Sequence, residues 1–109
     1  MEEKLKKLFE TIENLCSIRA ECAGVEPSLE IESFYEQYEN SGESPALVAS
    51  FLDNYQKWLM DAEIAKYFNK GSSLSAEKYG SAAQSLVIAQ DTFHEIFNEL
   101  QQKVKRAGR

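Results

Sequence analysis

The chain has 109 residues, a formal net charge of -6 and a hydrophobic fraction of 43%. This length suits one domain and is enough to bury a substantial core, so we expect residues 1–109 to form a single helical domain. The acidic balance argues against broad binding to nucleic acids, because phosphate binding requires a basic surface. There is no apolar run near 18 residues, so we expect no segment that spans a membrane.

Apolar residues recur at spacings of three and four, the pattern of amphipathic helices. The first helix is predicted at residues 3–23 and the second at residues 28–40. Gly24 and Pro27 interrupt the pattern between them, and Gly42 closes the second helix, since glycine favours helix C-termini and proline cannot continue a helix. The apolar positions of the first helix are Leu5, Leu8, Phe9, Ile12, Leu15, Cys16 and Cys22, and those of the second are Ile31, Phe34, Tyr35 and Tyr38.

The third helix is predicted at residues 44–70 and the fourth at residues 74–105. Ser44 is a good N-cap and Pro45 suits the first helical position, where its missing N–H is not needed. The segment Gly71-Ser72-Ser73 separates the two helices. Four helices with short connections predict an all-α, four-helix up-down-up-down bundle.

The charges are sorted along the chain. Residues 21–63 contain ten carboxylates and one basic residue, Lys57, whereas the segment that follows is net positive and ends in a basic tail. Part of this acidic charge lies on one face of the predicted second helix, and this strip is either a solvated face or a docking surface for a basic protein. Its members are Glu32, Glu36 and Glu39, and Glu43 continues the spacing just beyond the helix.

The predicted third helix carries a second apolar stripe. Met60, Ile64 and Tyr67 stand at i, i+4 and i+7, and Met60 lies about 180° from Phe51, the centre of the core face. A helix that is apolar on two sides is either central in its bundle or in contact with another chain. The stripe therefore predicts a central helix, a partner-binding face or a homodimer interface.

Arg19 lies near the centre of the first helix's apolar face. Its long side chain either reaches outwards to solvent or makes an internal ion pair or a contact with a bound molecule, because a buried guanidinium needs a partner. Cys16 and Cys22 are six residues apart on one helix and point about 120° apart, so we expect two reduced thiols and a cytoplasmic location.

His94 is the single histidine, and the chain has no CxxC pair, no phosphate-binding glycine loop and no recognisable nucleophile motif. We therefore expect no enzyme activity, no cofactor and no metal. The function that we predict is a small acidic module that binds another protein with a basic surface, as an inhibitor, immunity factor, chaperone or adaptor. One alternative is a homo-oligomeric structural or assembly subunit. Another is a small-molecule or metal-binding bundle that uses His94.

Overall fold

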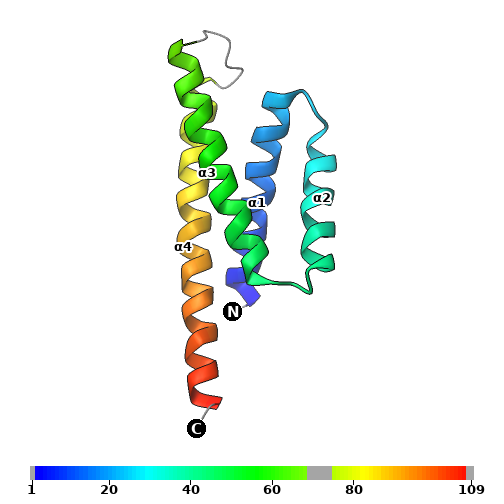
Figure 1. Ribbon diagram of the computed structural model, residues 1–109, viewed down its shortest axis with the longest axis vertical. Coiled ribbons are helices and arrows are strands. Elements are labelled where there is room, and N and C mark those ends of the chain that lie inside the picture. The colour runs from blue at the N-terminus through cyan, green and yellow to red at the C-terminus, as the bar shows by residue number, and fades with distance from the viewer. Residues whose placement is uncertain (1, 69–74, 108–109) are drawn as a thin grey trace.

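The computed structural model describes the backbone of residues 2–68 and 75–107 and the side chains of residues 3–64 and 75–102. This part of the chain forms four α-helices without strands, and successive helices run in opposite directions (Figure 1). The predicted all-α, up-down-up-down bundle is confirmed. Its helices are α1 (Glu2–Ala23), α2 (Pro27–Asn40), α3 (Pro45–Phe68) and α4 (Ala76–Ala107).

Two of the predicted glycine stops are Schellman caps. At the end of α1, Gly24 has φ +72° and the Val25 N–H donates to the Ala20 carbonyl oxygen at 2.9 Å. At the end of α2, Gly42 has φ +74° and the Glu43 N–H donates to the Tyr38 carbonyl oxygen at 3.0 Å. These bonds satisfy carbonyls that a helix end otherwise leaves without partners.

The helix starts differ from the predicted bounds by one or two residues. Pro27 is the first residue of α2, because a proline at this position gives up an N–H that has no helical partner. Ser44 caps α3, accepting a hydrogen bond from the Ala46 N–H at 3.2 Å, and Ser75 caps α4 in the same way through the Lys78 N–H at 3.2 Å. The predicted break at Gly71-Ser72-Ser73 lies outside the described residues.

α1 and α4 run antiparallel and share the most extensive helix–helix contact of the bundle, and α1 lies between α4 and α2 (Figure 1). Ion pairs hold both ends of this pair: Lys4 contacts Glu95 and Glu99 at one end, and Lys78 contacts Glu21 at 3.3 Å at the other. α2 packs on the other side of α1, and α3 packs on α4.

The core is apolar and draws on all four helices. A fully buried Leu or Ile side chain contributes about 1.5–3 kcal/mol relative to an exposed one, so this cluster is the main source of stability. One polar atom within it, the hydroxyl oxygen of Tyr55, has no hydrogen-bond partner. The most deeply buried members are Leu8, Ile12, Leu15, Cys16, Ala20, Tyr55, Ala82 and Ala89.

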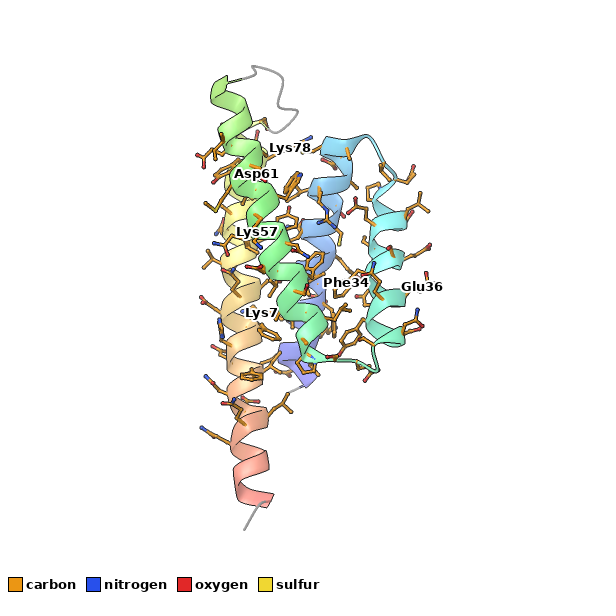
Figure 2. All side chains as sticks on the ribbon, in the orientation of Figure 1. Lys7, Phe34, Glu36, Lys57, Asp61 and Lys78 are labelled. Atoms are coloured by element: carbon orange, nitrogen blue, oxygen red, sulfur yellow. The ribbon has the colours of Figure 1, made fainter. Side chains whose placement is uncertain are left out.

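α2 is the peripheral helix, and Phe34 is its one buried residue. Phe34 points into the bundle, where its ring lies 5.0 Å from that of Phe51 on α3, whereas Glu36 points away from the bundle (Figure 2). α2 is joined to α1 more firmly, through a hydrogen bond of 2.7 Å from the Tyr35 hydroxyl to Glu13 among other contacts. The α2–α3 contact is the smallest between neighbouring helices, so the bundle is least closed along this seam.

Candidate functional site

The acidic strip on α2 is exposed to solvent. Glu32, Glu36 and Glu39 are exposed and share the helix face that lies opposite Phe34. Glu43 is also exposed, but it lies in the α2–α3 loop with φ +60°, so it does not extend the helical strip. Burial raises the pKa of the Tyr38 phenol, and the nearby Glu43 carboxylate adds to that rise.

The second apolar stripe on α3 faces solvent over its described part. Met60 is 54% exposed and Ile64 is 52% exposed, while the side chain of Tyr67 lies outside the described residues. α3 packs against α4 and, slightly, α2, so it is not a central helix and its outer side meets no other helix. Packing among the residues that the structure describes therefore does not explain the exposure of Met60 and Ile64.

Two hydrogen bonds between α3 and α4 define the register of these helices, and with it the residues of α4 that lie beside the stripe. Gln90 donates to the side-chain oxygen of Gln56 at 3.1 Å, and the Tyr79 hydroxyl donates to Glu63 at 2.8 Å. In this antiparallel register Met60 lies about one helical turn along the bundle from Val87, which is 54% exposed. We call Met60, Ile64 and Val87 the α3–α4 patch. Val87 was not predicted from the sequence, because its place in the patch depends on the register between the helices.

The seam between α2 and α3 forms a groove of about 410 Å³, which we call the α2–α3 groove. Its apolar lining comes from both helices, and hydroxyl and amide groups lie among these side chains. Arg19, from α1, and Glu30, from α2, are the charged residues of its lining. The apolar lining residues are Leu29, Phe34, Leu47 and Phe51, and the uncharged polar ones are Ser33, Gln37, Ser50 and Asn54.

Arg19 makes an internal ion pair. Its Nε donates to the Glu30 carboxylate at 3.0 Å, and its guanidinium lies over the rings of Phe51 and Tyr55 at 5.5 and 5.6 Å from their centroids. The Arg19 side chain is 28% exposed and that of Glu30 is 23% exposed. Of the interpretations drawn from the sequence, the internal ion pair is confirmed, and an arginine that only reaches out to solvent is wrong. Glu30, Phe51 and Tyr55 were not predicted as its partners.

His94 is the residue for which a chemical role was considered from the sequence. It is exposed and borders a pocket of about 150 Å³ with Asp53, Gln56 and Gln90. The Asp53 carboxylate is paired with Lys57 at 3.3 Å. Among the described side chains, no group of three or more His, Cys, Asp or Glu residues is placed to hold a metal ion.

The two cysteines are thiols, as expected from their spacing. Cys16 is buried in the core and Cys22 is half-buried. Burial raises the pKa of the Cys16 thiol to about 11, which disfavours the reactive thiolate at neutral pH.

Comparison with known proteins returns no relative for this chain: no protein-family model matches it, and no curated protein or solved structure is significantly similar. None of the described helices is both long enough and apolar enough to cross a membrane.

Proposed function

We propose that this chain is a protein-interaction module, which acts by binding another polypeptide without catalysis. The α3–α4 patch is the observation that carries the proposal. Met60, Ile64 and Val87 are each more than half exposed, and together they place apolar surface on the outer side of two packed helices. Such surface is unfavourable in water, and patches of this kind mark interaction sites on soluble domains.

The acidic strip supports a partner with a basic surface. Glu32, Glu36 and Glu39 are exposed on a helix that has no basic residue, so their field is not cancelled locally. Opposite charges across an interface raise the association rate and select partners more than they raise the affinity. The two reduced thiols are consistent with a reducing compartment such as the cytoplasm.

A second candidate uses the same α3–α4 patch: a homo-oligomeric assembly subunit, in which the patch of one copy covers that of another. A two-fold interface joins the same surface on both copies, and a patch that combines apolar area with flanking charges suits such pairing. The two candidate functions differ in what covers the patch, either a different protein or a second copy of this chain. The mass of the protein in solution therefore distinguishes them.

The test is Ile64→Glu, with Ile88→Glu as the matched control. Ile88 is also exposed, but it lies about 100° around α4 from Val87, outside the patch. Both variants should keep the circular dichroism of the wild type. A partner retained by the wild type and by Ile88→Glu, but lost from Ile64→Glu, supports the interaction module. A wild-type dimer that only Ile64→Glu converts to a monomer supports the assembly subunit. If neither binding nor mass responds to Ile64→Glu, the patch is not an interface.

A further inference from the structure

The α2–α3 groove is separate from the α3–α4 patch. Its walls are Leu29, Ser33 and Phe34 on α2 and Leu47 and Phe51 on α3, whereas the patch lies on the far side of α3. The smallest contact between neighbouring helices is the one along this seam, so the groove is present without any rearrangement of the core.

The lining of the groove suits an amphipathic polypeptide. Leu47 and Phe51 contribute half-buried apolar side chains to it, and Leu29, also in its lining, is 58% exposed, the highest value among the large apolar side chains described. From Leu29 to Gln37 the α2 wall extends about 12 Å, or roughly two helical turns. A helix that binds in such a groove inserts one set of apolar residues at i, i+3 or i+4, and i+7.

The charge around the groove selects a basic occupant. The one cation in the lining, Arg19, is already paired with Glu30. The outer face of α2 carries Glu32, Glu36 and Glu39, and a helix is about 10 Å across, so these carboxylates lie about one Debye length from the groove. They attract a cationic segment while it is still in solution, and the uncharged polar groups of the lining then meet it at short range.

We propose that the α2–α3 groove binds one basic amphipathic helix of a partner protein, with its apolar face on Leu29, Leu47 and Phe51 and its basic residues in the field of the acidic strip. This inference rests on the proposed function, that the chain binds other polypeptides, but it uses a different surface. The two proposals can therefore fail independently.

The probe is a synthetic peptide of about 14 residues, long enough to fill the groove, with Leu at helical spacing and Lys elsewhere. The same peptide with Glu in place of Lys is the charge control. Affinity is measured by titration calorimetry at physiological salt, and the site is mapped by NMR shifts of the backbone amides. The Lys peptide should bind and shift the amides of Ser33, Ser50 and Asn54, and the Glu peptide should bind at least about tenfold more weakly.

Ser50→Trp fills the groove without changing charge, and Ser33→Trp does the same from the opposite wall. Ser81→Trp is the matched control, since Ser81 is exposed on α4, which does not contact α2. Either groove variant should weaken the Lys peptide by about tenfold or more, whereas Ser81→Trp and Ile64→Glu should leave its affinity unchanged.

Three results would overturn the groove as this binding site: no binding of the Lys peptide, equal binding of the Glu peptide, or undiminished binding by both folded groove variants. A loss confined to Ile64→Glu would move the site to the α3–α4 patch, which overturns the groove proposal and leaves the proposed function standing.

Discussion

The guanidinium Nε of Arg19 on α1 and the carboxylate of Glu30 on α2 are joined at 3.0 Å across the α1–α2 turn. The pair is partly buried, and the guanidinium also stacks over the aromatic rings of Phe51 and Tyr55 on α3. This one side chain of α1 therefore contacts two further helices, α2 and α3, where the bundle is least closed. It links α2 to α3 beside the α2–α3 groove, and both Arg19 and Glu30 belong to the lining of that groove.

Breaking this pair should destabilise the fold measurably. We expect Arg19→Met and Glu30→Gln each to lower the free energy of unfolding by about 1–2 kcal/mol, because each leaves a partly buried charge without its partner. The double variant should lose less than the sum, since it leaves no lone charge. Urea unfolding of the four proteins gives the coupling energy. The exposed Lys57–Asp53 pair is the control, and removing it should change stability too little to measure reliably. If the stability losses of the two single variants simply add in the double variant, the coupling energy is zero and the ion pair itself does not stabilise the fold.

Replacing Tyr55 with phenylalanine should stabilise the fold. Its side chain is fully buried and its hydroxyl has no hydrogen-bond partner, so that polar group was desolvated without compensation. We expect Tyr55→Phe to raise the free energy of unfolding by about 1 kcal/mol, while the ring keeps its contacts with Trp58 and Arg19. Denaturant melts of the two proteins check this. A destabilised Tyr55→Phe would mean that the hydroxyl is bonded after all.

Gly42 and Gly80 should respond in opposite ways to the same substitution. Gly42 has φ +74°, so Gly42→Ala should cost about 1–2 kcal/mol through backbone strain alone, as nothing lies within 4 Å of an added Cβ. Gly80 lies within α4, also with nothing within 4 Å, so Gly80→Ala should gain up to about 1 kcal/mol in helix propensity. The thermal unfolding midpoints of the two variants, compared with that of the wild type, test both expectations. Equal effects would contradict the assigned backbone conformations.

The helices could be predicted from the sequence because the signals that start and end them are local. Ser44 and Pro45 at the start of α3 and the glycines after α1 and α2 act within a few residues, and the structure uses all of them. Contacts between helices are not local in this way: at Gly80, within α4, no neighbouring helix comes within 4 Å of the position that a Cβ would take.

The candidate surfaces could be predicted less well because they depend on how the helices are arranged. The exposure of Met60 and Ile64 follows from their helical spacing once α3 is known to lie at the side of the bundle. Val87 joins them through the α3–α4 register, and Glu30 meets Arg19 through the geometry of the α1–α2 turn. No periodicity within one helix contains this information, so the α2–α3 groove was not foreseen.

Cys16 should make the stability of the protein sensitive to alkaline pH. Burial raises the pKa of its thiol from an ordinary 9.0 to about 11 in the folded state, so between these values the folded chain holds a proton that the unfolded chain has released. The contribution of the protonated thiol is therefore complete below pH 9 and is lost as pH rises through about 11. Burial also raises the pKa of Tyr55, and burial together with the Glu13 hydrogen bond raises that of Tyr35, so further loss follows at higher pH.

The variant that isolates this effect is Cys16→Ala. Near neutral pH it should be less stable than the wild type by about 1 kcal/mol or somewhat more, because it truncates a buried side chain. As pH rises from 8 to 11 the wild type loses the thiol's contribution and the variant has none to lose. The stability difference should therefore shrink by on the order of 1–2 kcal/mol. Urea unfolding of both proteins at several pH values measures it, and a difference that stays constant to pH 11 would contradict a raised thiol pKa.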